Sequence, residues 1–453
     1  MCDIEMRDRK RLGKDVHSPA LGCVVAVLLC TTAFGAEWEE QSRIKPADWG
    51  ERKYSVRALS MSEDRLLIAA NVTDAEDRSG PGMACVYRLD GTGWIAEGVL
   101  DPGPIRRLEL YGFSANLSGP VALVGCLAAG AAWPVKPPDR VGPAGPGAVF
   151  VFRHRDSGWV KEARLVPHDR EDNDHFGSSV SVDGDRAVVG KPHDDENGIG
   201  SGSAYVFRFD GTKWVQEAKL LPGDGEKGDG FGHDVSISGT TVLISARNAS
   251  RKFLQSGAAY VFRLDGAEWR QEARLVPAEA EYDDRFATSV SLCGDRALIG
   301  ASSDDTTARD AGAAYIFRFD GSRWVEDAKL LPFRTRGHHY PEIGTGYGEF
   351  GSAVFLSADR AVIGAGNDNE RGSGAGSVSV FRFDGAAWVR EAKLLASDAA
   401  RLGHFGDAVA MSGDTIIAGT AQNESTGKDA GGVYVYTLRR GPEQQETSAQ
   451  DPD

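Results

Sequence analysis

Short segments of alternating apolar and polar residues recur along the chain with a period of about 55 residues. Residues 176–220 begin FGSSVSVDGDRAVVGKP and end GSAYVFRFDGTKWVQEAKL, and residues 231–275 repeat this order. Such alternation over four to eight residues is typical of strands with one buried face. The pair Asp210-Gly211, which separates the last two segments, is a signal for a tight hairpin turn. Each unit therefore predicts four short antiparallel strands, designated a, b, c and d.

The tryptophans indicate how many units the chain contains. Seven of the nine occupy the start of strand d, with successive spacings of 56, 65, 55, 55, 55 and 64 residues. The two long spacings place extra residues within 127–147 and 333–349. Seven such units predict an all-β fold, a seven-bladed β-propeller with four antiparallel strands per blade; a solenoid of stacked sheets is the alternative. The seven residues are Trp38, Trp94, Trp159, Trp214, Trp269, Trp324 and Trp388.

The two ends of the repeated region complement each other. The last unit has strands a, b and c, and a polar tail at 439–453 follows it. Residues 38–48 have the pattern of a strand d without a unit of their own, and Trp38 aligns with Trp214. We therefore expect the N-terminal strand to complete the last blade as its outermost strand, which removes an open sheet edge. The propeller is predicted over residues 37–438.

The first 36 residues have the pattern of a secretory signal peptide. Five basic residues lie within 7–14, an apolar run follows from Ala20 to Leu29, and small residues surround Gly35 and Ala36. Cleavage is expected after Gly35 or Ala36, and an uncut signal anchor is the alternative. The pattern predicts a secreted or extracytoplasmic protein, periplasmic or at the cell surface, with no membrane span once the signal is removed.

Composition narrows the function classes. The chain of 453 residues has 66 acidic and 51 basic residues, a net charge of −15, and 56 glycines. This balance argues against a basic nucleic-acid-binding protein, and the short strands argue against a coiled coil. Three cysteines follow the signal region, at Cys85, Cys126 and Cys293. An odd number spread over the chain is no disulfide framework, so we expect small buried hydrophobic side chains there.

The repeats resemble the FG-GAP repeat family, whose members include the propeller of integrin α-subunits and many extracellular bacterial proteins. The second half of its motif corresponds to Gly190-Lys191-Pro192 and Gly300-Ala301-Ser302. The resemblance implies a secreted interaction propeller of the short bacterial type. In integrins the a–b hairpin of several blades carries a calcium loop, but the turn at 182–186 is too short to supply six to eight oxygen ligands. The first half corresponds to Phe176-Gly177, Phe231-Gly232, Phe350-Gly351 and Phe405-Gly406.

Candidate binding residues lie in loops that a propeller brings to one face. The d–a and b–c loops share that face. One long insertion, within 127–147, lies in a b–c loop, and the other, within 333–349, lies in a d–a loop. Non-repeating loops on a repeating scaffold are frequent sites of function. Several of these loops are acidic. They predict a negatively charged rim that binds calcium or a basic partner, and the alternative is a solvated surface with no ligand. The candidates are Trp133, His338, His339, Tyr340, Asp194 and Asp195.

The regular repetition favours binding over catalysis. An enzyme needs one asymmetric set of residues at one point, and the sequence contains no evident nucleophile–base pair, so no catalytic residue is assigned. We expect a non-catalytic binding, adhesion or scaffold module with a protein or glycan ligand and no cofactor, calcium being the one left open. A carbohydrate-active hydrolase or lyase is the alternative, which a deep central pocket with asymmetric Asp, Glu or Arg would favour. A part of an adhesion complex is a third interpretation.

Overall fold

The computed structural model divides the chain into two compact units, Glu37–Arg439 and the terminal residues Met1–Ala36 with Arg440–Asp453. The predicted signal peptide lies outside the described residues except for Ala36, and so does the predicted tail beyond residue 440. The structure describes residues 36–44, 53–73, 82–91, 93–105, 109–127, 145–250, 255–333, 348–399, 401–420 and 431–440.

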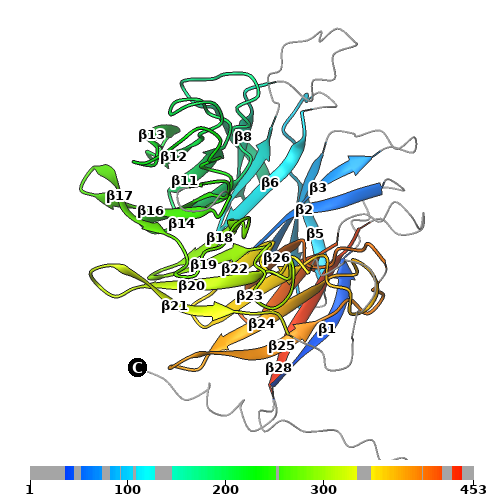
Figure 1. Ribbon diagram of the computed structural model, residues 1–453. Helices are drawn as coiled ribbons and strands as arrows, with labels where there is room; N and C mark the ends of the chain where they lie inside the picture. Colours follow the sequence, from blue (N-terminus) through cyan, green and yellow to red (C-terminus); the bar gives the residue numbers. More distant parts are fainter. Residues whose placement is uncertain are drawn as a thin grey trace, which may run out of the picture. The chain divides into compact units, whose positions relative to one another are not determined.

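The larger unit is a ring of seven four-stranded sheets, as the sequence predicts (Figure 1). Blade 1 contains β2 (Lys53–Ser62), β3 (Arg65–Thr73), β4 (Met83–Leu89) and β5 (Trp94–Val99). Blade 2 contains β6 (Tyr111–Ser118), β7 (Val121–Cys126), β8 (Ala148–Arg155) and β9 (Gly158–Leu165). Blade 3 contains β10 (Val180–Asp183), β11 (Arg186–Lys191), β12 (Ser203–Phe209) and β13 (Trp214–Leu220).

The other four blades follow the same order. Blade 4 contains β14 (Val235–Ser238), β15 (Thr241–Ala246), β16 (Ala258–Asp265) and β17 (Glu268–Leu275). Blade 5 contains β18 (Phe286–Cys293), β19 (Arg296–Ala301), β20 (Ala313–Phe319) and β21 (Trp324–Leu330). Blade 6 contains β22 (Ala353–Leu356), β23 (Arg360–Ala365), β24 (Ser377–Phe383) and β25 (Trp388–Leu394). Blade 7 contains β26 (Ala408–Ser412), β27 (Thr415–Gly419), β28 (Val433–Arg440) and β1 (Ala36–Ile44).

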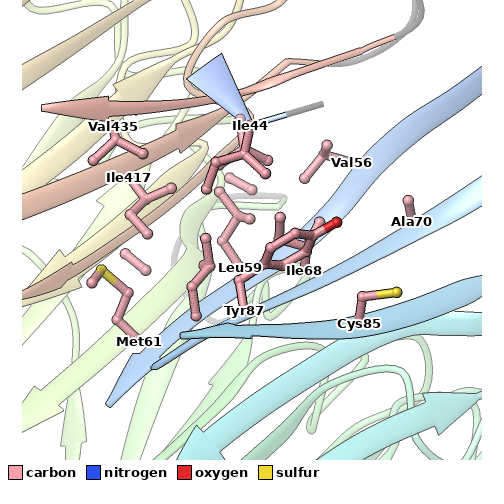
Figure 2. Close-up of a cluster of buried hydrophobic side chains, with 14 of the residues drawn as sticks. Ile44, Val56, Leu59, Met61, Ile68, Ala70, Cys85, Tyr87, Ile417 and Val435 are labelled. Carbon is pink, nitrogen blue, oxygen red and sulfur yellow. The ribbon is translucent and has the colours of Figure 1, made fainter. Parts of the chain in front are cut away.

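The N-terminal strand closes the ring, which confirms the prediction. The last sheet has the order β1-β28-β27-β26, so β1 is its outermost strand (Figure 1). The strand ends at Ile44, and residues 45–52 lie outside the described part of the chain. A hydrophobic cluster fills the joint between blades 7 and 1. Figure 2 shows Ile44, Ile417 and Val435 of blade 7 gathered against Leu59 and Tyr87 of blade 1.

The Phe-Gly pair of each repeat docks one blade onto the preceding one. Phe231 is fully buried, with its ring edge-on to Tyr260 at 5.5 Å. Gly232 follows at φ +87°, where a Cβ would overlap the carbonyl oxygen of Ser203 in blade 3. A Cβ on Gly190 would in turn overlap the carbonyl oxygen of Gly232. Both halves of the repeat motif are therefore required by the same close approach of two backbones.

Polar side chains join adjacent blades at the inner and outer strands. On the inner strand, Ser181 Oγ accepts a hydrogen bond from Ile237 N of the next blade over 3.2 Å. On the outer strand, Trp214 Nε1 donates to Glu162 Oε2 of the preceding blade over 2.9 Å. The same outer bond joins Trp159 to Glu97, Trp269 to Glu217, Trp324 to Glu272 and Trp38 to Glu391. These repeated bonds fix the angle between neighbouring sheets.

Two of the three described cysteines are buried as predicted, and Cys293 is only partly buried. None of the three forms a disulfide among the described residues. Cys85 and Cys126 have 2% and 0% of their surface exposed. Stability therefore depends on packing and on the bonds between blades.

Candidate functional site

A cavity of about 600 Å³ lies at the centre of the ring. It is lined by the first residues of strand a from all seven blades, together with residues at the ends of strand b such as Leu127, Pro192 and Arg247. The start of strand a and the end of strand b lie at the same end of an antiparallel pair. The cavity therefore opens toward the face that carries the d–a and b–c loops.

The cavity wall differs in chemistry from blade to blade. The second residue after the repeat Phe, or after its equivalent, is a hydroxyl in three blades and a basic, acidic, imidazole or aromatic residue in the other four. A repeating scaffold thus presents an asymmetric ring of side chains at its centre. In blade order these residues are Arg57, Phe113, Ser178, His233, Thr288, Ser352 and Asp407.

Basic side chains gather on the wall formed by blades 3 and 4. The His175 and His193 rings are 4.3 Å apart, with a tilt of 38°. Burial lowers the pKa of His175, and the neighbouring His193 lowers it further. Burial also lowers the pKa of His233 to about 4, with Arg247 as the next contributor. The imidazoles of His175 and His233 are therefore neutral near pH 7, and Arg247 is a positive charge on this side.

Three polar atoms of the cavity wall have no hydrogen-bond partner. They are His233 Nδ1, Ser178 Oγ and Ser352 Oγ, all of them buried. Buried polar atoms are normally satisfied, because leaving one unpaired costs about 1–3 kcal/mol. Their concentration around one cavity marks it as a place where the structure is not optimised for stability alone.

The opposite wall contains a carboxylate beside an arginine. Enclosure by the ring raises the pKa of Asp407 to about 6, a rise that His404 opposes and Glu349 increases. Arg57 also acts on this carboxylate, and its guanidinium lies 4.9 Å from the centre of the Phe113 ring. This side of the cavity therefore has its positive and negative charges balanced.

A second aspartate of the wall, Asp234, has a structural role. Asp234 accepts hydrogen bonds from Ser179 Oγ at 2.7 Å, Val235 N at 3.0 Å and Val290 N at 2.8 Å. Burial raises the pKa of this carboxyl. Because its oxygens already hold three donors from blades 3, 4 and 5, Asp234 acts as a joint between blades.

No group of three His, Cys, Asp or Glu side chains in the part of the chain that the structure describes is arranged to hold an ion. The three histidines of blades 3 and 4 are close in space, but they do not form such a set. The chemistry of this wall is that of hydrogen bonding and charge.

Four of the predicted binding residues lie outside the described residues. These are Trp133 of the first insertion and His338, His339 and Tyr340 of the second, and their binding roles stay predictions. Asp195 is exposed on the b–c loop of blade 3, where its Oδ1 accepts a hydrogen bond from Gly200 N at 2.8 Å. Of the two described candidates, neither Asp194 nor Asp195 is among the residues that line the central cavity.

Asp194 is held inside its blade. Lys191 Nζ lies 2.9 Å from this carboxylate and 2.8 Å from Asp174. Burial alone would raise the pKa of Asp194, but hydrogen bonds from Lys191 and Ser203 lower it. Its predicted binding role is untested, yet all these contacts serve to tie the loop to strands β11 and β12.

Some aspartates of the acidic loops are buried, so these loops are not simply the solvated surface that the sequence offered as one alternative. Asp174, Asp229 and Asp284 of successive d–a loops are buried. Each accepts a hydrogen bond from the backbone N–H three residues earlier, and the Asp229–Glu226 N distance is 2.8 Å. A short acidic side chain at this position closes the loop, as in other aspartate turns. These three aspartates are therefore needed to hold the conformation of their loops.

Reasoning from the sequence missed the central cavity. The variation after the repeat Phe was visible as Ser178, His233 and Asp407, but nothing in one strand shows that seven such positions converge. His175 precedes the repeat Phe, and its variation between units favoured a surface position. The structure places it in the cavity wall. Variation at one aligned position of every repeat was the signal that could have identified the site.

Comparison with known proteins agrees with this architecture. A family model described as FG-GAP repeat matches residues 159–207, 214–262, 269–317 and 388–436. Each match begins at the tryptophan of one strand d and ends in strand c of the next blade. No curated protein matches the chain. In the residues that the structure describes, no helix is long and apolar enough to cross a membrane. Four matched units within a seven-bladed propeller show that the chain contains FG-GAP repeats.

Proposed function

We propose that this propeller is a secreted, non-catalytic binding or scaffold module that engages its ligand on the face of the d–a and b–c loops. The observation that supports this most is the cavity of about 600 Å³ that opens on that face. Its volume is within the range of ligand pockets. Its wall carries an asymmetric set of side chains from the seven blades, as a specific site requires.

The wall favours binding over catalysis. Among the described lining residues no hydroxyl is hydrogen-bonded to an imidazole, so no activated nucleophile is formed. Glycoside hydrolysis usually needs two carboxyl groups that are free to act on the substrate. Asp234 is occupied by three structural hydrogen bonds, which leaves Asp407 as the carboxylate that faces the cavity.

A carbohydrate-active hydrolase or lyase remains the second candidate, because the pocket is charged and asymmetric. Asp407, with its pKa of about 6, would be the acid or base of such an enzyme, and Arg57 would hold an acidic sugar. Incubation with neutral and acidic polysaccharides, followed by measurement of reducing ends and of unsaturated products, tests this candidate. We expect no product, and turnover that Asp407→Asn abolishes would replace the binding proposal.

Export of the chain is part of the proposal. Residues 1–36 have the pattern of a signal peptide, and the FG-GAP family is typical of extracellular proteins. N-terminal sequencing of the exported protein is expected to begin at Ala36 or Glu37. Retention of residues 1–35 in a membrane fraction would instead support the uncut signal anchor.

The binding role is tested by a screen of the exported chain against glycan and protein arrays. We expect a glycan or protein ligand and no nucleic acid. Variants in which residues 128–144 or 334–347 are replaced by short Gly-Ser linkers test the two inserted loops. A ligand whose binding is unchanged in both loop variants and is lost when the opposite face is blocked would contradict the proposed face.

We also propose that the module needs no cofactor, with calcium as the ion to test. Thermal unfolding is measured in excess calcium and in chelator. A ligand that binds only the folded state raises the apparent stability, so a saturable upward shift would mean that the acidic loops form a metal site. We expect equal melting temperatures in the two conditions.

A further inference from the structure

Arg247 is a cation without a counter-ion among the residues that the structure describes. It follows β15 directly and lines the central cavity, and its side chain is half-buried. Burial lowers the pKa of this guanidinium, and the charge of Arg285 lowers it further. Half-buried guanidinium groups are normally paired, because taking a charge out of water is costly.

The other arginines of the repeats show how a structural guanidinium is treated in this fold. Arg186 donates to both oxygens of Glu217 at 3.0 and 3.2 Å, and Arg360 does so with Glu391 at 2.9 and 3.3 Å. At the same cavity, the guanidinium of Arg57 lies over the Phe113 ring, and its charge acts on the carboxylate of Asp407. Arg247 has none of these partners, so its place in the wall is not explained by stability.

The charge of Arg285 adds to the positive potential at Arg247, and no described carboxylate pairs with Arg247. Arg285 repels it, and His233 is held neutral in its presence with Nδ1 unpartnered. Asp234 is the nearest carboxylate in sequence on this wall, but three hydrogen-bond donors already occupy it. A chain with a net charge of −15 therefore carries a local positive site at its centre.

We infer that the wall of blades 3 to 5 is a binding site for an oxyanion, a carboxylate or phosphate group of a small ligand, with Arg247 as its anchor. This inference rests on the proposed binding role and names the chemistry of the ligand. A guanidinium presents paired N–H donors that match two oxygens of such a group. His233 and the hydroxyl of Ser178 lie around the same cavity and supply further polar partners.

The cavity limits the size of this ligand. A volume of about 600 Å³ holds a molecule of roughly the size of a monosaccharide or a short acidic segment, not a folded domain. The balanced pair of Arg57 and Asp407 across the ring would then contact the rest of the ligand. An anion at Arg247 would also favour protonation of His233, because a nearby negative charge stabilises imidazolium.

Thermal shift and titration calorimetry of the exported chain test the site with defined probes. Sodium phosphate, sodium acetate and sodium glucuronate are compared with sodium chloride at equal ionic strength and with neutral glucose. We expect a saturable rise in melting temperature with at least one oxyanion and none with chloride or glucose. A stronger response to phosphate indicates a phosphorylated ligand, and a stronger response to glucuronate than to acetate indicates an acidic sugar.

Two variants separate a binding role of Arg247 from a structural one. Arg247→Met keeps most of the side-chain volume, and we expect affinity to fall at least tenfold while the ligand-free protein melts at the same or a higher temperature. Arg270→Met is the control, since Arg270 is 64% exposed in the outer hairpin of blade 4 and should leave binding unchanged. In ¹H–¹⁵N spectra, the oxyanion should shift the His233 imidazole of the parent protein and not that of Arg247→Met.

Absence of a saturable response to all three oxyanions would overturn the inference, and so would a response that Arg247→Met retains. Neither result would refute the proposed binding role, which depends on the separate array screen. An array ligand that is neutral and binds Arg247→Met with unchanged affinity would support the binding role and reject the oxyanion site.

Discussion

Trp38 Nε1 donates a hydrogen bond to Glu391 Oε2 over 3.2 Å, although 353 residues separate the two in the chain. It is the same contact that Trp214 makes with Glu162, 52 residues away, between two blades in the middle of the sequence. The last joint of the ring is thus closed by the bond that forms the ordinary joints. What differs is that the tryptophan comes from the opposite end of the chain.

Loss of the N-terminal strand should destabilise the whole ring. Deletion of residues 36–44 removes the Trp38 bond and takes Ile44 out of the cluster between blades 7 and 1. It also exposes the edge of β28. We expect a loss of several kcal/mol in the free energy of unfolding, since burial of one large aliphatic side chain alone contributes about 1.5–3 kcal/mol. Urea unfolding followed by tryptophan fluorescence measures it.

The milder variant Trp38→Phe isolates the hydrogen bond. Glu391 would keep its bonds to Arg360, so we expect a loss of about 1–2 kcal/mol, close to that of Trp214→Phe. Equal urea midpoints for the parent chain and the deletion would show that β1 contributes nothing to closure.

Asp327→Glu should stabilise the protein by restoring the hydrogen bonds of the outer strands where blades 5 and 6 meet. Asp327 occupies the position at which blade 3 has Glu217, and it is shorter by one methylene. Two buried atoms near it have no partner, Trp388 Nε1 of blade 6 and Arg296 Nε of blade 5. In blade 3 the equivalent glutamate accepts from both of its counterparts, Arg186 and Trp269. A glutamate at 327 reaches both groups, and we expect a gain of about 1–2 kcal/mol.

The reverse change in blade 4 is the matched control. Glu272→Asp should shorten a working joint and lose the bond from Trp324, which is 2.9 Å long. We expect opposite shifts of the urea midpoint for the two variants at an unchanged slope. Two shifts of the same sign would mean that the length of this side chain does not determine the strength of the joint.

Removal of the buried lysine of blade 3 should be costly. Lys191 is 2% exposed and lies between the carboxylates of Asp174 and Asp194, at 2.8 and 2.9 Å. Lys191→Met would leave both buried near each other without this partner, and loss of one partner of a buried ion pair costs about 3–5 kcal/mol. Chemical unfolding at pH 7 checks this loss.

A second substitution tests the cause. In Lys191→Met/Asp174→Asn the repulsion between the two carboxylates is removed, so part of the lost stability should return. A double variant no more stable than Lys191→Met would show that packing of the lysine stem, and not its charge, holds this loop.

The sequence was sufficient for the strands, the number of blades and the closure, because these depend on local and repeated signals. Trp38 could be matched to Trp214 by alignment, and the glycines of the motif mark positions where backbones meet, as Gly232 does. The cavity depends on what seven separate strands bring together. Arg57 and Asp407 lie 350 residues apart in the numbering and at opposite ends of the repeated region. Only the closed ring makes them neighbours, so their chemistry could not be assigned from either strand.

The loops of blade 5 should give a stronger pH dependence of stability than those of blade 3, where burial also raises the pKa of Asp174. Asp284 corresponds to Asp174, but Ala301 replaces the lysine that pairs with it. Burial raises the pKa of Asp284 to about 6, and Asp304 increases it. A carboxyl whose pKa is higher in the folded state than in the unfolded chain favours folding when protonated. Its contribution is therefore full below about pH 4 and is lost as the pH rises to about 6.

Two variants test this in blade 5. Asp284→Asn should be more stable than the parent chain at pH 7 by about 1 kcal/mol after solvent screening, and equal to it near pH 4. Ala301→Lys should restore the pairing of blade 3 and also stabilise at pH 7, by lowering the pKa of Asp284. Unfolding free energies are compared with the parent chain between pH 4 and 7.5, so that the titration of Asp407 in the same range cancels. A constant difference in unfolding free energy between Asp284→Asn and the parent over this range would mean that the pKa of Asp284 is not raised. Solvation by water would then be enough to stabilise the Asp284 carboxylate without the lysine.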